Sequence, residues 1–368
     1  MRKLRSRMAT AGALAVLVPS AAWAQSSVTL YGVIDTGVEF VNNVGPQNNS
    51  MMRMLTLSGT VPSRWGLRGT EDLGGGLKSA FVLESGFGPD TGTSNQGGRL
   101  FGRQAWVGLQ SNSWGQVAFG RQYTMLFWAT LDTDILGPNV YGSMDSYFAN
   151  ARADNAISYK GKFGGLTLGA TYSFGRDATA TTLPSPSATN CPGENPADKN
   201  ACREWSAMLM YETNWLGASV AYDSLRGGPG AFAGLTSSGL KDDRAVLSGY
   251  MLLDRTKIGA GVLARRNGAL AAPRSNMYFA GVSYDLTPVV NVAAEAYYLD
   301  YRHSDNKAWL GAVRGTYAFS KRTSVYVSGG YIDNSGQLNI SVSAGAPGAN
   351  PVAGGNQFGV TAGIKHIF

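Results

Sequence analysis

The sequence predicts an all-β protein, a 16-stranded antiparallel β-barrel that crosses a membrane. The composition, with 49 Gly, 17 Tyr and only 15% charged residues, is typical of many strands joined by tight turns. Apolar and polar residues alternate along segments of strand length, and short turns alternate with long polar segments. Although 44% of the residues are hydrophobic, no segment after residue 24 approaches the roughly 18 consecutive apolar residues of a membrane-spanning helix.

The alternation has a period of two residues and places charge on one face. In "VTLYGVIDTGVEF", Leu30, Ile34, Val38 and Phe40 share one face, whereas Tyr31, Asp35 and Glu39 share the other. The segments 290–300 and 308–319 have the same pattern, with Glu295 and Arg314 on their polar faces. These strands run for about ten residues or more, as a tilted strand crossing a hydrocarbon core requires. The strands of a water-soluble sandwich are usually shorter.

Two kinds of connection alternate along the chain. Short turns are predicted at "EDLGGGLK", "NSWGQ", "KFGGL", "NWLGA", "DRTK", "DLTPVV" and "FSKRTS". Longer polar segments fall between them, among them residues 42–51, 88–99, 123–150, 226–239 and 343–355. The count gives about sixteen strands, with short turns at one end and long loops at the other. Closure into a barrel satisfies every backbone hydrogen bond within a bilayer.

The first 24 residues resemble a secretory signal. Arg2, Lys3, Arg5 and Arg7 precede an apolar run over residues 9–19, and Ala22 and Ala24 form an A-x-A cleavage motif. We therefore expect a signal peptide over 1–24 and one barrel domain over 25–368, although a basic amphipathic helix is the alternative. Removing 1–24 leaves 27 basic and 24 acidic residues. This mild, scattered charge does not indicate a nucleic-acid partner.

Cysteine usage agrees with export. Cys191 and Cys202 are the only cysteines and lie in the Pro- and Gly-rich segment "NCPGENPADKNACRE". A disulfide between them would remove about 3 kcal/mol of loop entropy from the unfolded chain. Metal binding is the weaker alternative, because His303 and His366 are both distant in sequence.

Several motifs together resemble the general porins of Gram-negative beta-proteobacteria, a family of 16-stranded trimeric barrels. The residues that carry the resemblance are "SSVTLYGVIDTGVEF", "SRWGLRGTEDLGGGLKSAFVLESGF", "GRQAWVGL", "FGRQYT" and the terminal "IKHIF". The resemblance covers nearly all of the chain after residue 24. In this family the terminal Phe, here Phe368, ends the last strand and serves as the barrel's assembly signal.

The resemblance also implies that the third long loop folds into the barrel and narrows it, with acidic residues facing basic ones. In the segment after "FGRQYT", the apolar residues Met125, Leu126, Phe127, Leu131 and Ile135 could pack on the inner wall. Asp132 and Asp134 match the family's constriction acids. Many relatives continue with Pro-Glu-Phe-Gly, but residues 137–140 here are Gly-Pro-Asn-Val. The glutamate is therefore missing, and Asp145 is the remaining substitute.

The basic side of the constriction is predicted on the barrel wall. The candidates are Arg64, Arg121, Lys160, Arg68 and Arg103. Alternation places Arg64 and Lys160 on the polar face. It argues against Arg121, unless Gly120 marks a β-bulge that turns the arginine inward. Arg103 lies near a strand end, where it could simply coat the rim, and any one of these residues could be ordinary lumen lining.

The resemblance implies a water-filled channel in the bacterial outer membrane for passive diffusion of small hydrophilic solutes and ions. Basic residues facing a loop short of acids predict a preference for anions. The alternatives are a solute-selective porin with a carboxylate or phosphate site at the constriction, and an adhesive barrel with a plugged lumen. The expected partners are two further copies in a homotrimer, outer-membrane lipid and lipopolysaccharide, and the barrel assembly machinery. No catalytic residue, cofactor or metal is predicted, since His303 lies in a loop without a serine motif.

Overall fold

The computed structural model describes residues 27–142, 151–177, 189–232 and 234–368. The predicted signal peptide and Asp145 lie outside these ranges. The strands are β1 (Ser27–Val44), β2 (Asn49–Met54), β3 (Arg64–Gly74), β4 (Leu77–Gly86), β5 (Gln104–Ser111), β6 (Gly115–Tyr123), β7 (Arg152–Phe163), β8 (Leu166–Ser173), β9 (Glu204–Glu212), β10 (Leu216–Arg226), β11 (Lys241–Leu253), β12 (Thr256–Asn267), β13 (Arg274–Thr287), β14 (Val290–Tyr301), β15 (Lys307–Ala318), β16 (Thr323–Asn334) and β17 (Asn356–Ile367). The helices are α1 (Asn95–Gly98) and α2 (Met125–Thr130), and among the described residues no helix is long and apolar enough to span a membrane.

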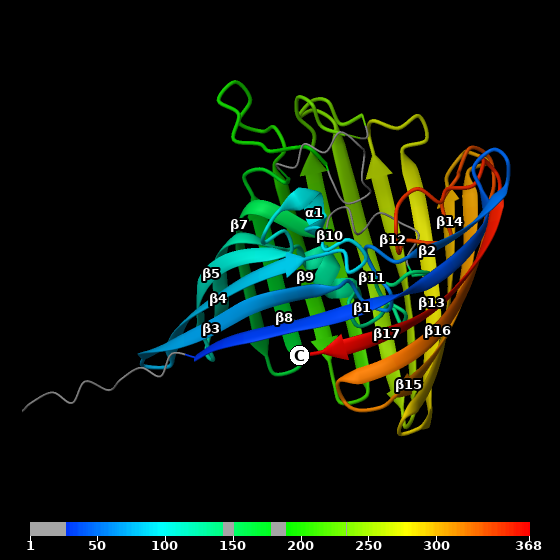
Figure 1. The fold of residues 1–368 in the computed structure, drawn as a ribbon. Coiled ribbons are helices and arrows are strands. Elements are labelled where there is room, and N and C mark those ends of the chain that lie inside the picture. The colour runs from blue at the N-terminus through cyan, green and yellow to red at the C-terminus, as the bar shows by residue number, and fades with distance from the viewer. Residues whose placement is uncertain (1–26, 143–150, 178–188, 233) are drawn as a thin grey trace, which may run out of the picture.

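The strands form one closed antiparallel sheet, because β17 returns to pair with β1 (Figure 1). β2 and β3 pair with successive parts of the same edge of β1: β2 with residues 38–44 and β3 with residues 27–33. The seventeen segments therefore fill sixteen positions, which confirms the predicted 16-stranded barrel. The first polar segment is shorter than expected from the sequence, since only residues 45–48 lie between β1 and β2.

The break between β2 and β3 is held by a carboxylate on the inner face of β1. Asp35 Oδ2 accepts hydrogen bonds from the amides of Thr60 (2.8 Å) and Val61 (3.0 Å). The Thr60 hydroxyl also donates to Asp35 Oδ2, and Asp35 Oδ1 accepts a fourth hydrogen bond from the hydroxyl of Tyr326 on β16, at 2.7 Å. The Ser63 hydroxyl bonds to both the amide and the carbonyl of Asp35. In the irregular segment 55–63, the Thr60 and Val61 amides thus bond to β1, whereas the Thr56 and Leu57 amides bond to the Gly345 carbonyl.

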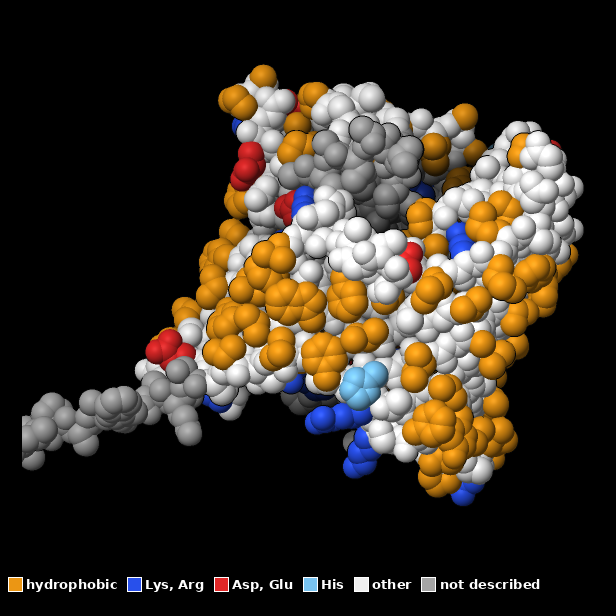
Figure 2. Space-filling model, in the orientation of Figure 1, with side chains coloured by type: hydrophobic (Ala, Val, Ile, Leu, Met, Phe, Trp, Pro, Cys, Tyr) orange, Lys and Arg blue, Asp and Glu red, His pale blue; other side chains and the backbone are white. Residues whose placement is uncertain are grey.

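The two faces of the wall differ as the alternation predicts. Leu30, Ile34 and Val38 are exposed on the outer face, whereas Asp35 and Glu39 are buried on the inner face. In Figure 2, apolar side chains cover the outer wall and the charged side chains lie mostly toward its two ends. The outer surface suits a hydrocarbon environment and the inner surface suits water.

The barrel closes at the end of the chain. The amide of Phe368 donates to the carbonyl of Gly32 at 3.1 Å, and the amide of Gly32 donates to the carbonyl of Phe368 at 3.0 Å. A Cβ on Gly32 would lie 2.3 Å from the Phe368 ring, so the glycine leaves room for the aromatic side chain. The last residue is therefore part of the sheet that joins β17 to β1.

The β-bulge that the sequence suggests at Gly120 is present. Gly120 has a φ of +122°, and the pairing of β6 with β7 shifts register between Gly120 and Gln122. Phe119, before the bulge, is 51% exposed on the outer face. Few side chains adopt this backbone conformation, so a glycine is needed here.

Gly120→Ala is expected to destabilise the barrel by about 1–3 kcal/mol, because it adds strain at positive φ and its Cβ would lie 2.2 Å from the Ala105 carbonyl oxygen. Urea unfolding in lipid vesicles measures the change. Gly311→Ala is the matched control, since a Cβ there meets no described atom within 4 Å. Equal midpoints for the two variants would contradict the strain argument.

Candidate functional site: the narrowed lumen

The loop after β6 enters the barrel through helix α2. Thr124 caps the helix by accepting a hydrogen bond from the Phe127 amide at 3.4 Å. Met125, Leu126 and Phe127 are buried, as predicted, and Met125 fills the space above Gly169 of β8. Leu131 differs from the prediction, because 40% of its surface is exposed. The helix packs on the inner faces of β8–β11.

Three serines on adjacent strands hold the helix backbone. The Met125 amide donates to the Ser206 hydroxyl on β9 at 2.9 Å. The Ala129 carbonyl accepts from Ser219 on β10 at 2.6 Å and from Ser248 on β11 at 2.9 Å. These side chains satisfy backbone groups that lie inside the lumen, away from any sheet.

The next part of the loop is fixed to β14 and β15. Glu295 accepts hydrogen bonds from the amides of Ile135 (3.2 Å) and Leu136 (2.6 Å). Tyr297, also on β14, donates to Asp134 at 2.8 Å, and Arg314 on β15 donates to the Leu136 carbonyl at 3.4 Å. A carboxylate that accepts two backbone amides is a strong anchor for a loop.

The described part of the loop ends against β16 and β17. The Tyr141 hydroxyl is 2.8 Å from that of Thr361, and its ring packs over Gly330 and Gly359, where a Cβ would clash. Burial, with a smaller contribution from Glu39, raises the pKa of the Tyr141 hydroxyl. The Val140 amide donates to the Gly59 carbonyl at 2.8 Å. The loop thus crosses the lumen from β9 to β17. Its hydrogen bonds to strands lie on that side of the barrel, and the inner face of β3–β7 is left open to the lumen.

The uncovered wall carries most of the predicted basic residues. Arg64 and Arg68 share the inner face of β3, where Gly66 between them pairs with Tyr31. Glu84 on β4 lies 2.7 Å from Arg103 and 3.6 Å from Arg64. The guanidinium of Arg68 lies 5.2 Å from the centre of the Tyr31 ring. Glu84 is therefore the ion-pair partner of both Arg64 and Arg103, while Arg68 forms no ion pair among the described residues.

Lys160 on β7 contacts the loop directly. Its Nζ lies 3.7 Å from the centre of the Trp128 ring of α2. No carboxylate in the described parts of the chain is within ion-pair distance of this ammonium group. Asp132 is exposed and lines the same cavity as Lys160, whereas Asp134 is buried against Tyr297. The two predicted acids therefore have different surroundings.

Arg121 belongs to a network near the loop end of the barrel. It forms an ion pair with Asp154, and its Nε donates to the Gly102 carbonyl at 2.7 Å. Arg99 lies 2.8 Å from both Asp154 and Asp177. The bulge thus brings Arg121 to an acidic partner, and its place in a constriction remains a prediction.

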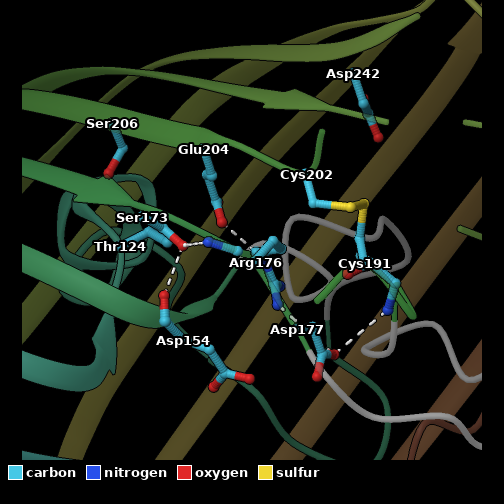
Figure 3. Close-up of polar contacts among 12 residues, drawn as sticks. Thr124, Asp154, Ser173, Arg176, Asp177, Cys191, Cys202, Glu204, Ser206 and Asp242 are labelled. Carbon is cyan, nitrogen blue, oxygen red and sulfur yellow. Dashed lines mark hydrogen bonds and ion pairs between the residues drawn. A yellow bond between two sulfur atoms is a disulfide. The ribbon is translucent and has the colours of Figure 1, made fainter. Parts of the chain in front are cut away.

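The predicted disulfide is confirmed beside this network (Figure 3). The Cα atoms of Cys191 and Cys202 are 5.2 Å apart, and Cys191 exchanges backbone hydrogen bonds with Asp177. The preceding residue, Arg176, pairs with Glu204 of β9 at 3.0 Å. The disulfide therefore fixes the segment that supplies Asp177. Among the described residues, no three His, Cys, Asp or Glu side chains are grouped as metal ligands.

Sequence reasoning did not identify the residues that anchor the loop. The alternation placed Glu295 and Arg314 on the polar, inward faces of their strands. That direction was the available sign that they could contact a loop inside the barrel. Their partners lie more than a hundred residues away in the sequence, at Leu136. Lys365 of β17, which lies in the field of Asp35, Arg314 and Arg64, was also not singled out.

Comparisons with known proteins agree with this geometry. A model of the Gram-negative porin family matches residues 9–337. Outer membrane porin protein 32 of Delftia acidovorans is 32% identical, over 97% of this chain and 98% of its own. An outer membrane porin protein of Bordetella pertussis is 31% identical, over 88% and 93% respectively. The solved anion-selective porin from Comamonas acidovorans has a TM-score of 0.75 and 27% identity, over 94% of this chain and 100% of that one.

Glu295→Ala is expected to loosen the loop, because the Ile135 and Leu136 amides lose their shared acceptor. Amide hydrogen exchange in the peptide over residues 131–142 should become about tenfold faster, while exchange in the strands stays unchanged. Glu71→Ala, which removes an exposed carboxylate near the β3–β4 turn, is the charge-matched control. Unchanged exchange in Glu295→Ala would show that this carboxylate does not hold the loop.

Proposed function

Because the chain belongs to the Gram-negative porin family and is an outer-membrane channel, we propose that its narrowed lumen passes small hydrophilic solutes and ions passively and favours anions. The observation that carries the anion preference is the arrangement of Arg64, Arg68 and Lys160 on the wall left uncovered by the loop. A narrow water-filled passage between low-dielectric walls focuses the field of a few fixed charges.

The charge balance of this passage supports the proposal. Glu84 is shared between Arg64 and Arg103, so a single carboxylate opposes two guanidinium groups. On the loop, Asp134 accepts a hydrogen bond from Tyr297 and lies buried against the wall. The glutamate that many relatives carry after these aspartates is absent, which leaves Asp132 as the exposed acid among the described loop residues. The related porin from Comamonas acidovorans is described as anion-selective.

The proposal includes assembly and export. The apolar outer faces of β1, β3 and β4, with Leu30 and Val38 exposed, suit packing in a homotrimer. Residues 1–24 would direct export and be removed, leaving the domain over 25–368. Phe368, paired with Gly32, would be recognised by the barrel assembly machinery, and basic loop residues would contact lipopolysaccharide.

Single-channel recording in a planar bilayer tests the function directly. The purified protein should open in groups of three equal steps, and the zero-current potential across a KCl gradient should have the sign of chloride preference. A heat-sensitive oligomer band on gels should accompany these openings. Properly folded protein that stays silent, or that prefers potassium, would overturn the proposal.

The double variant Arg64→Gln/Lys160→Gln should reduce the chloride preference. Each charge lost from a water-filled constriction removes about 1 kcal/mol of attraction, or roughly a fivefold change in the permeability ratio per charge. The zero-current potential across the same gradient measures the ratio. Lys321→Gln, at the exposed turn before β16, is the control and should leave the potential unchanged. Equal potentials for the double variant and the control would remove these two residues from the selectivity mechanism.

A further inference from the structure

Beside helix α2 the lumen holds a cavity of about 700 Å³ that is unusual for a barrel interior. Its wall comes from the inner faces of β4–β9, and its other side is formed by Trp128, Leu131 and Asp132 of the loop. A barrel lumen is normally lined by polar side chains. This cavity has an apolar side as well as a charged one.

The apolar side comes from both the loop and the wall. Leu131 follows the helix and is 40% exposed, although it lies inside the barrel rather than against lipid. Trp128 is partly exposed beside it, and Met208 and Met210 lie on β9. The neighbouring Tyr123 ring supports Trp128 edge-on at 5.7 Å. An organic ligand could remove this apolar surface from water, which would favour its binding.

The charged side has a small net positive charge. The cavity is lined by three lysines, Lys78, Lys160 and Lys162, and by two carboxylates, Asp132 and Glu212. Lys162 and Glu212 pair at 3.1 Å, and Glu212 also accepts a hydrogen bond from Tyr250. Lys160 has no such acidic partner among the described residues, and its ammonium group rests on Trp128. Lys160 is therefore available beside the apolar surface.

We propose that this cavity is a binding site for small organic monocarboxylates with an apolar body, such as aromatic acids. The carboxylate pairs with Lys160, and the apolar body covers Leu131 and Met210. This inference rests on the proposed channel function and names a class of solute for it. A volume of 700 Å³ is within the range of small-molecule sites.

The charge of the site distinguishes this ligand from other anions. A phosphate or a short dicarboxylate would bring a second negative charge close to Asp132 and Glu212, and it would leave the apolar surface uncovered. Acetate would pair with Lys160 but has too little apolar surface to gain much from Leu131 and Met210. The site therefore favours a single carboxylate attached to a ring or a longer chain.

Block of the KCl current by benzoate tests the proposal, with acetate as the probe that lacks the apolar body. Benzoate should reduce the current saturably, and acetate at the same concentration should not. The half-blocking benzoate concentration should rise about tenfold in Lys160→Gln, because a charge-assisted contact is lost. It should rise severalfold in Leu131→Ser and stay unchanged in Lys321→Gln, the matched control, because Lys321 lies at the exposed turn before β16 and does not line the cavity. Each variant is compared with its own benzoate-free current.

Equal block by benzoate and acetate, or benzoate block that survives both Lys160→Gln and Leu131→Ser, would overturn the site. Calorimetric titration of benzoate into the purified protein adds a readout that does not depend on conduction. Saturable binding without any KCl current would overturn the channel proposal while supporting the site. A KCl current without saturable benzoate binding would overturn the site and leave the channel proposal standing.

Discussion

The need to satisfy every backbone hydrogen bond within hydrocarbon is the constraint on which the rest of this structure depends. No water is available there, so the sheet can have no free edge. β1 meets this need by pairing with β17 on one edge and with both β2 and β3 on the other. The bonds between Gly32 and Phe368 complete the closure. Where β2 ends and β3 has not begun, Asp35 and Ser63 supply the missing partners.

Closure creates a lumen, and the loop that crosses it faces the same requirement in a different form. Its amides and carbonyls lie inside the barrel without a neighbouring strand. Side chains of the wall therefore provide the partners: hydroxyl groups hold the helix, and Glu295 holds the segment after it. These anchors all lie from β9 round to β17. On the opposite wall, β3–β7, Tyr123 stacks on Phe127 and Lys160 lies against Trp128, whereas Arg64 and Arg68 lie away from these contacts.

Much of the fold could be predicted from the sequence because the two-residue period and the turn positions are local signals. The alternation placed Asp35, Glu295 and Arg314 inward, and Gly120 indicated the bulge. The short first turn and the break at residues 55–63 were not predictable, because they depend on Asp35 meeting Thr60 and Val61. The partners of Asp134 and Arg121 were equally hidden, since Tyr297 and Asp154 are distant in sequence. Contacts between residues that are distant in sequence decide which polar side chains have a partner. A local sequence pattern does not contain this information.

The partners of the basic residues also decide the electric field that an ion meets in the channel. The number of basic residues alone does not give that field. Arg103 and Arg121 are basic residues at positions that the sequence favours, yet each lies against a carboxylate. Arg68 and Lys160 rest on aromatic rings instead, so their charge is less compensated. An aromatic ring holds a cation in place without cancelling its charge, whereas a carboxylate does both. The anion preference that we propose for this lumen would therefore depend more on which basic residues have aromatic partners than on how many basic residues line it.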